Sequence, residues 1–283
     1  MSVNVLRPDA EAALAAWAAL VDADAEQVPR IREPEPPADH YDNTAARFRP
    51  GNLEALELPA LAALARPEDT WLDIGAGGGR FAVPLARRVA RLVAIEPSPA
   101  MRGTLTMAVA DAGLTNLEVH NTRWPDPAWS IDADVAMAAH VIYDIRAIGP
   151  FIEAMERHAR RLCVIVVAEA GRGANVARLF EAVHGEPQQT LPALREVVTL
   201  LGALGRTPEV HLARREGPEA VTEREDAYDM ARRLLWLAHG SSKETRMRAL
   251  MEEWWGRPDG IALPGARRIV GVVSWEPGAA GRA

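Results

Sequence analysis

The sequence predicts an α/β protein with a doubly wound, mostly parallel seven-stranded sheet, an N-terminal helical appendage and helical insertions near the C-terminus. Three observations support this fold. Apolar runs alternate with helix-like stretches through the middle of the chain, a glycine cluster follows the first run, and two late runs are typical of an antiparallel edge. Alternating strands and helices imply right-handed crossovers, and these produce a parallel sheet with helices on both faces.

The N-terminal region, residues 1–50, contains one helix pattern at 9–27, with apolar residues at helical spacing: Leu14, Trp17, Leu20 and Val21. Four prolines follow between positions 29 and 37. Because proline disfavours helix at and before its own position, we expect an extended linker there. Residues 1–50 are therefore a candidate lid.

The middle region, residues 51–170, carries the alternation. A helix is expected at about 52–66. Strand-like apolar runs follow at about 70–75, 91–96, 117–121, 133–139 and 162–169. Helix-like stretches separate them at about 79–90, 98–113 and 147–161. Several of the runs are apolar throughout, which is typical of strands covered on both sides.

The last region, residues 171–283, completes the sheet. Strands are expected at 208–215 and 268–275, where they could pair as an antiparallel edge. Helices are expected at 174–184, 192–204, 224–239 and 243–255. The segment 217–266 interrupts the strands as an insertion, and we interpret this region as a candidate substrate cap.

Composition narrows the class of protein. The chain is 48% hydrophobic and 25% charged with a net charge of −7, and its basic residues cluster only in pairs, so a nucleic-acid partner is not indicated. The only cysteine, Cys163, lies in an apolar run, and the histidines show no metal-ligand spacing, so no metal is expected. We see no signal peptide and no run of about 20 apolar residues, and we therefore expect a cytoplasmic protein without a membrane partner.

A glycine cluster follows the first apolar run directly, in the segment Trp71-Leu72-Asp73-Ile74-Gly75-Ala76-Gly77-Gly78-Gly79-Arg80-Phe81. Glycines at this position let the backbone turn tightly and let a ligand approach without a Cβ in the way. The amide groups at the start of the next helix would face that ligand. A strand before the cluster and a helix after it indicate a ligand-binding turn.

The residues that flank the glycine cluster indicate which class of ligand it binds. Counted from Gly75, the third glycine of a dinucleotide-binding fingerprint falls at position 80, which is Arg80. Asp73, at the end of the strand, would repel a pyrophosphate but suits a ligand with an ammonium and a sulfonium group. Glu96 ends the next strand and can accept hydrogen bonds from both ribose hydroxyls of a nucleoside. The alternative is that the two acids only cap helices.

These residues resemble those of a known family. LDIGAGGGRFAVPLA followed by VAIEPSPAM is similar to the first two motifs of class I S-adenosylmethionine-dependent methyltransferases, specifically over about 70–101 and more loosely to about 170. The resemblance implies a Rossmann-like fold with S-adenosyl-L-methionine as cofactor. It assigns the turn to Gly75, Ala76 and Gly77, the amino-acid end of the cofactor to Asp73, the ribose to Glu96, and the adenine to the stretch from Pro97 to Met101.

The chain departs from this family after the third strand. An acidic residue usually meets the adenine amino group there, but the aligned position holds Asn121 or Thr122. We expect Thr122, Arg123 and Trp124 to hold the adenine through backbone groups and the indole ring. Trp124 could equally be a core residue.

The fourth strand is followed by His140 and Tyr143. In an open parallel sheet the site lies at the carboxyl ends of the strands, near the switch in strand order. His140 is our candidate general base, because its ordinary pKa lies near 6.5, and Tyr143 is a candidate contact for acceptor or cofactor. Alternatively, His140 only contacts the cofactor or the backbone.

The acceptor is not indicated by any motif. Three segments are candidates to select it: the N-terminal region with His40, Tyr41 and Arg47-Phe48-Arg49, the segment 171–192, and the insertion 217–266, where Trp254 or Trp255 could line a pocket. We expect methyl transfer to a small molecule. The alternatives are a non-catalytic protein that binds S-adenosylmethionine for regulation or as a scaffold, and an NAD(P)-dependent oxidoreductase.

Overall fold

A computed structural model of the chain describes residues 9–42, 44–171, 173–215, 221–264 and 268–278. Its centre is a seven-stranded sheet of order β3-β2-β1-β4-β5-β10-β6. The strands are β1 (Thr70–Ile74), β2 (Arg91–Ile95), β3 (Leu117–His120), β4 (Ala133–Ala139), β5 (Ala159–Ala168), β6 (Glu209–Arg215) and β10 (Arg268–Trp275). The first five run parallel, and β10 pairs antiparallel with both β5 and β6. The predicted sheet and its antiparallel edge are confirmed.

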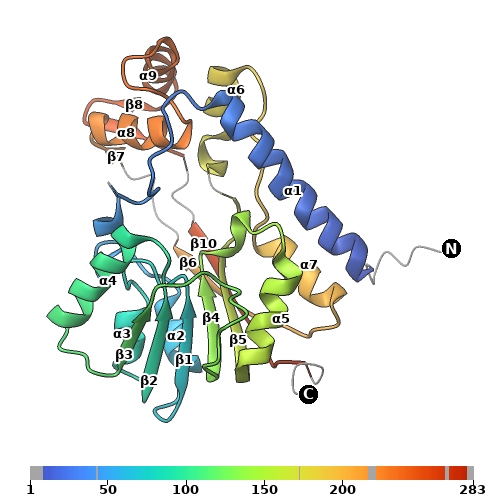
Figure 1. The fold of residues 1–283 in the computed structure, drawn as a ribbon. Coiled ribbons are helices and arrows are strands. Elements are labelled where there is room, and N and C mark those ends of the chain that lie inside the picture. The colour runs from blue at the N-terminus through green and yellow to red at the C-terminus, as the bar shows by residue number, and fades with distance from the viewer. Residues whose placement is uncertain (1–8, 43, 172, 216–220, 265–267, 279–283) are drawn as a thin grey trace.

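Helices cover both faces of this sheet (Figure 1). One face packs against α1 (Ala10–Ile31), α5 (Ile148–His158) and α7 (Leu194–Ala203). The other packs against α2 (Leu58–Leu64), α3 (Ala82–Ala86) and α4 (Pro99–Asp111). Strand β4 is buried along almost its whole length, which explains why the run is apolar without alternation. The chain leaves β1 toward β3 and returns at β4, so the switch in strand order lies between β1 and β4.

A second, smaller core lies beyond the sheet (Figure 1). We name it the cap: it contains α6 (Ala177–His184), α8 (Arg224–Leu234), α9 (Ser242–Trp255) and a small sheet of β7 (Val221–Thr222), β9 (Gly260–Ala262) and β8 (Gly256–Arg257). The insertion was expected to be helical, and the three short strands were missed because two or three residues carry no periodic pattern. Among the described residues there are also three 3₁₀ turns: η1 (Ala45–Phe48), η2 (Ile142–Asp144) and η3 (Ala174–Val176).

The N-terminal helix is longer than predicted. Residues from 28 onward were expected to be extended, but α1 continues through Pro29 to Ile31. Ile31 is buried in the core of the cap, and the Arg32 amide donates to the Val28 carbonyl at 2.9 Å, so packing at the end of the helix outweighs the hydrogen bond that Pro29 cannot make. Because Trp17 is buried against the sheet, α1 joins the sheet to the cap.

Two predicted helices near the turn are shorter than expected. The helix expected at 52–66 is α2, which starts only at Leu58, because Pro59 fits the first turn of a helix and residues before it form turns. The helix expected at 79–90 is α3, which spans five residues.

Among the described residues, no helix has the length and apolar character required to cross a membrane.

Candidate active site

The glycine turn follows β1 and is held against β2. The amides of Gly75 and Ala76 both donate to the Ile95 carbonyl, at 2.8 and 3.0 Å. Gly75 has φ +74°, and a Cβ there would stand 2.6 Å from Val141. Gly77 also has a positive φ, +57°, but the nearest atom to its Cβ position is the Met101 Sδ at 3.8 Å. A Cβ would therefore clash at Gly75, whereas at Gly77 it would make only an ordinary contact with Met101.

Asp73 stands just before this turn and is only 1% exposed. Neither of its carboxylate oxygens has a hydrogen-bond partner among the described residues. Burial, and then the negative charge of Glu96, raise the pKa of Asp73 to about 7. A buried carboxylate without partners is costly, and a cationic group beside it would remove much of that cost.

Glu96 connects the turn to the second strand. One of its carboxylate oxygens accepts from the Gly77 amide at 2.7 Å, and the other accepts from the Ser98 amide at 2.8 Å. Burial raises the pKa of Glu96, and these two hydrogen bonds oppose the shift. Each oxygen keeps a lone pair for a further donor, as a ribose diol requires.

The N-terminal segment reaches the same place. Asp39 accepts from the Ser98 hydroxyl at 2.7 Å, from the Ala100 amide at 3.1 Å and from the Tyr41 amide at 3.0 Å. Hydrogen bonds from Tyr41, Ser98 and Ala100 lower the pKa of Asp39. Asp39 was not predicted from the sequence, because a single acid in a proline-rich linker carries no pattern that points to a helix about 60 residues away.

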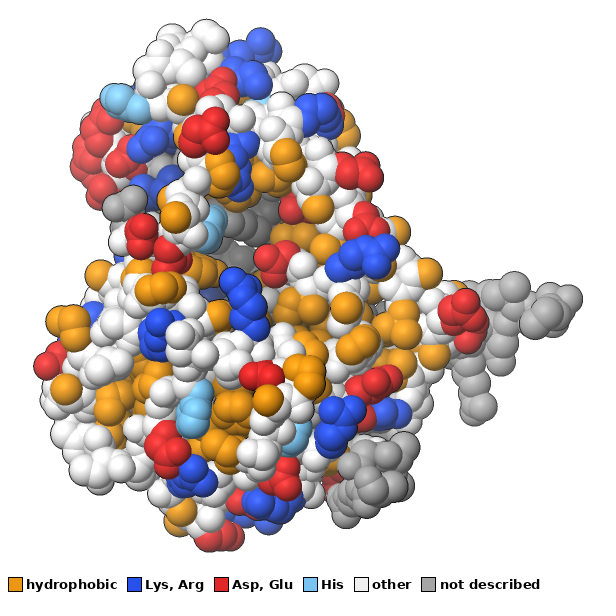
Figure 2. Space-filling model, in the orientation of Figure 1, with side chains coloured by type: hydrophobic (Ala, Val, Ile, Leu, Met, Phe, Trp, Pro, Cys, Tyr) orange, Lys and Arg blue, Asp and Glu red, His pale blue; other side chains and the backbone are white. Residues whose placement is uncertain are grey.

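The same segment also lies under the cap. The backbone of Phe48, in η1, closes one side of Gly78, where a Cβ would stand 2.9 Å from its carbonyl. Burial and then the positive charge of Arg47 lower the pKa of Arg233, so η1 also lies near α8. Figure 2 shows this face of the molecule hollowed between the cap and the sheet.

Two of the three residues predicted to hold the adenine after β3 are hydrogen-bonded within the protein. Thr122 donates its hydroxyl to Asp126 at 2.5 Å, and Arg123 is exposed. The Trp124 indole donates to the Phe151 carbonyl at 3.3 Å and packs on the α5 face of the sheet. Core contacts thus account for the position of Trp124, and its role toward adenine stays a prediction.

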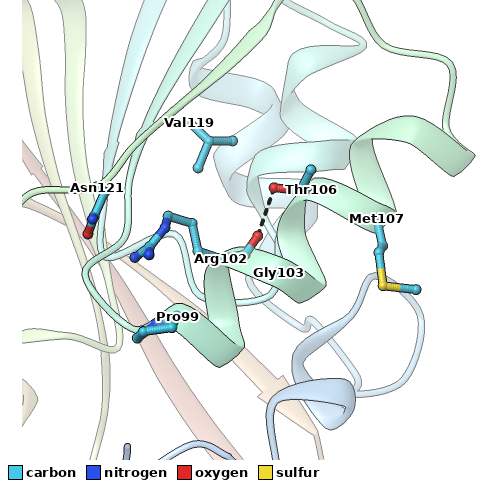
Figure 3. A pocket seen from close by; sticks show the side chains of 7 residues that line it. All are labelled: Pro99, Arg102, Gly103, Thr106, Met107, Val119 and Asn121. Carbon is cyan, nitrogen blue, oxygen red and sulfur yellow. Dashed lines mark hydrogen bonds between the residues drawn. The ribbon is translucent and has the colours of Figure 1, made fainter.

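An open groove lies beside this stretch, between α4 and β3 (Figure 3). It is lined by Pro99, Arg102, Gly103, Thr106, Met107, Val119 and Asn121. Arg102 does not reach out of it, since its guanidinium donates to the carbonyls of Glu96 and Pro97 at 3.0 Å each. No residue of the glycine turn lines the groove, so the chemistry of Asp73 and Glu96, rather than this cavity, locates the candidate site.

His140 and Tyr143 lie beyond the end of β4, as predicted. His140 has a left-handed backbone, φ 58°, and its amide donates to the Val166 carbonyl at 2.9 Å. Its Nδ1 lies 2.9 Å from the Tyr143 hydroxyl and its Nε2 lies 2.7 Å from a carboxylate oxygen of Glu57. Glu57, which precedes α2 and is completely buried, was not predicted from the sequence. Val141, the residue after His140, packs on Gly75, so the His140 cluster borders the glycine turn.

The tryptophans proposed for an acceptor pocket lie in the cap. The guanidinium of Arg178 stacks over the Trp254 ring at 4.2 Å, and the Trp254 and Trp255 rings meet edge to face. Both rings pack against the cap core while staying partly exposed. Packing explains their positions.

The strand order, the glycine turn and the two buried acids are the features that a site for a nucleoside with a positive charge requires. Comparison with known proteins identifies the family. The model of a methyltransferase domain matches residues 45–200, which is more than half of the chain, and the chain belongs to the S-adenosylmethionine-dependent methyltransferases. Its cofactor is S-adenosylmethionine. A search of curated proteins gives no match.

Solved structures agree with the fold. YcgJ from Bacillus subtilis superposes with a TM-score of 0.54 at 14% identity, covering 79% of this chain and 99% of that one. A putative methyltransferase from Bacillus halodurans gives 0.55 at 12%, covering 78% and 98%. A methyltransferase from Thiobacillus denitrificans, solved with S-adenosylhomocysteine, gives 0.53 at 14%, covering 83% and 97%.

Proposed function

We propose that the protein transfers the methyl group of S-adenosylmethionine to a small-molecule acceptor held between the sheet and the cap. The observation that carries this proposal is the buried Asp73 carboxylate, which has no hydrogen-bond partner among the described residues and stands just before the glycine turn. A ligand with an ammonium group fits there, because it supplies the donors and the positive charge that Asp73 lacks.

Different residues in and around the turn bind different parts of the cofactor. Asp73 binds the ammonium, Gly75, Ala76 and Gly77 form the turn, and Glu96 accepts from the ribose hydroxyls. Pro97 and the buried Met101 border the adenine, together with Thr122, Arg123 and Trp124 on the opposite side. The unpartnered oxygens of Asp73 support its role in binding the ammonium group. The free lone pairs of Glu96 support its role in binding the ribose hydroxyls.

When bound, the cofactor supplies a methyl group that the sulfonium charge already activates. The protein must then hold the acceptor atom in line with the methyl carbon, and good positioning contributes up to roughly 7–11 kcal/mol. A general base adds about a hundred- to ten-thousand-fold where the acceptor must lose a proton. We assign the base to His140, because Val141, the next residue, packs on Gly75, and we assign a contact with acceptor or cofactor to Tyr143, because its hydroxyl is hydrogen-bonded to His140.

The surroundings favour a small acceptor. The segment with Asp39 and η1 lies over α4, and α8 of the cap lies near η1. We therefore assign residues 1–50 to a lid, 51–170 to the cofactor-binding core and 171–283 to the rest of the sheet and the substrate cap. A net charge of −7 provides no attraction for a nucleic-acid backbone.

Calorimetric titration of the purified protein with S-adenosylmethionine, S-adenosylhomocysteine and NADH tests the proposal. We expect the first two to bind and NADH not to bind. Formation of S-adenosylhomocysteine in the presence of a metabolite extract then separates an enzyme from a non-catalytic binding protein. Failure of both methyl-donor ligands to bind would overturn the proposal.

A further inference from the structure

Three side chains beside the glycine turn form one continuous hydrogen-bonded chain. Glu57 contacts the Nε2 of His140 at 2.7 Å, and the Nδ1 of His140 contacts the Tyr143 hydroxyl at 2.9 Å. The Tyr143 oxygen also accepts from the Ala168 amide at 2.9 Å. The same oxygen of Glu57 that binds His140 also binds the guanidinium of Arg80. The chain therefore runs from a buried carboxylate to a phenol that is partly exposed.

The positions of the protons follow from the partners. Burial alone would raise the pKa of Glu57, but the hydrogen bond and charge of His140 and the charge of Arg80 lower it overall, so Glu57 is ionised and can only accept. The Nε2 of His140 must therefore carry a hydrogen. In a neutral imidazole the Nδ1 is then an acceptor, and the Tyr143 hydroxyl donates to it.

We propose that Glu57 is a positioning residue, which holds the His140 imidazole in its Nε2–H form so that the lone pair of Nδ1 faces the Tyr143 hydroxyl as a proton acceptor. This inference rests on the proposed methyl transfer. It assigns the site to acceptors that carry a proton on the reacting atom, such as a hydroxyl or an amine.

The proton balance of this path is complete. As the acceptor's bond to hydrogen breaks, its proton passes to the Tyr143 oxygen while the phenolic proton of Tyr143 moves to the Nδ1 of His140. The electron pair left on the acceptor atom forms the bond to the methyl carbon, and the thioether leaves with the pair of the broken carbon–sulfur bond. His140 becomes an imidazolium, paired with the Glu57 carboxylate.

The charges around His140 explain why Glu57 is needed. Arg80, ahead of α3, and Arg268, at the start of β10, both disfavour a positive imidazolium, as does burial, which is the main cause of the lowered pKa of His140. Glu57 is the negative group that opposes them. Tyr143 from η2 completes the set that faces the ring. Without Glu57, a proton on His140 would be strongly disfavoured.

The experiment is nitrogen NMR of the histidine side chains in the protein saturated with S-adenosylhomocysteine. The His140→Asn variant identifies the signal, since asparagine tolerates a left-handed backbone. We expect the neutral Nε2–H tautomer in the wild type, and the same tautomer in Tyr143→Phe. In Glu57→Gln the pKa of His140 should fall, because the variant loses the negative charge that opposes burial and the two arginines. Glu54→Gln is the matched control, because Glu54 pairs with exposed Arg215, and it should leave His140 unchanged.

The outcomes separate the two proposals. An Nδ1–H tautomer in the wild type, a switch of tautomer in Tyr143→Phe, or an unchanged pKa of His140 in folded Glu57→Gln would overturn the role of Glu57. Calorimetry on the same samples measures S-adenosylhomocysteine binding independently. If the wild type does not bind it, the proposed function fails, whatever the state of His140 in the unliganded protein.

Discussion

Asp73 and Glu96 lie at the carboxyl ends of neighbouring parallel strands, and the negative charge of Glu96 makes Asp73 costlier to ionise. The two strands pair in register, with Ile74 beside Ile95. Burial and the charge of Glu96 raise the pKa of Asp73 to about 7, whereas Glu96 has two backbone amides to stabilise its charge. The folded protein thus holds one satisfied and one unsatisfied acid at the same turn. A positive ligand relieves the unsatisfied one.

Replacing Asp73 by asparagine should stabilise the protein without ligand. The pKa of Asp73 is raised from 3.8 to about 7 on folding, so the folded state binds more protons, and stability falls as pH rises between these values. Above pH 7 the full cost, roughly 4 kcal/mol, is present. Because a buried amide also lacks partners, we expect a net gain of about 1–3 kcal/mol in urea unfolding at pH 8, shrinking toward pH 4. A loss of stability at pH 8 would contradict this account.

The same variant should bind the cofactor less tightly. Loss of a charge-assisted hydrogen bond worth roughly 1.5–3 kcal/mol corresponds to tenfold or more in affinity for S-adenosylhomocysteine. Glu96→Gln should weaken binding by a similar factor, because its amide nitrogen cannot accept. Glu118→Gln is the control, since Glu118 is exposed on β3 and pairs with Arg91. Calorimetry decides the matter, and wild-type affinity in Asp73→Asn would refute the assignment.

Cofactor affinity should also depend on pH. A ligand ammonium favours the ionised form of Asp73, so binding must displace a proton wherever the free protein holds one, which is below about pH 7. We expect affinity for S-adenosylhomocysteine to rise from pH 5.5 to 7.5. Titrations at pH 6 in buffers of different ionisation enthalpy should show release of up to about one proton. In Asp73→Asn this release should vanish.

Alanine substitutions at two glycines of the turn should have different effects on stability and on cofactor binding. In Gly75→Ala the methyl group would meet Val141 at 2.6 Å, and a left-handed alanine costs about 1–2 kcal/mol by itself, so the folded protein should lose at least this much. Gly77→Ala carries the same backbone cost but no clash, since its methyl group would make only an ordinary contact with Met101 at 3.8 Å, and this methyl group would stand beside the proposed cofactor. We therefore expect Gly77→Ala to be the more stable variant in urea, yet to bind S-adenosylhomocysteine poorly.

Gly113 provides the control for both variants. It has φ +63° at the end of α4, and no atom lies within 4 Å of its Cβ position. Gly113→Ala should therefore show the backbone cost alone and bind the cofactor normally. If Gly77→Ala also binds normally, the ligand does not lie beside Gly77.

The sheet and the turn could be predicted because their causes are local. A strand covered on both faces is an apolar run, and a turn that a ligand approaches needs glycine, so β1, β4 and the segment after Ile74 are visible in the sequence. Glycine spacing alone does not select the ligand: counted from Gly77, the third position is Ala82, which a dinucleotide fingerprint accepts. Asp73 and the family match favour S-adenosylmethionine over a dinucleotide.

The rest of the site depends on contacts between distant parts of the chain. Glu57 meets His140 across 83 residues, and Asp39 meets Ser98 across 59. Each is an ordinary acid in an irregular segment, and only the folded backbone places it. The same holds for Pro29, which the helix tolerates because Ile31 is buried in the cap.

Asp39 should couple the N-terminal segment to the cofactor-binding helix. It is the acceptor for the Ala100 amide in the first turn of α4 and for the hydroxyl of Ser98, the N-cap. In Asp39→Ala we expect faster hydrogen exchange at Ala100 and over residues 39–42 and 44–48. S-adenosylhomocysteine should bind a few-fold more weakly, because the amides around Glu96 lose their support. Asp42→Ala, three residues away and exposed, should change neither.

The pH dependence of that exchange distinguishes Asp39 from Asp73. Hydrogen bonds lower the pKa of Asp39, so its contribution is fully present above its ordinary value of 3.8 and is lost only as pH falls below it. Once the intrinsic exchange rate is corrected for, protection at Ala100 should therefore stay constant from pH 5.5 to 7.5, the range in which cofactor affinity rises through Asp73. Protection that followed cofactor affinity over this range would mean that the N-terminal segment responds to the charge of Asp73 rather than to its own carboxylate.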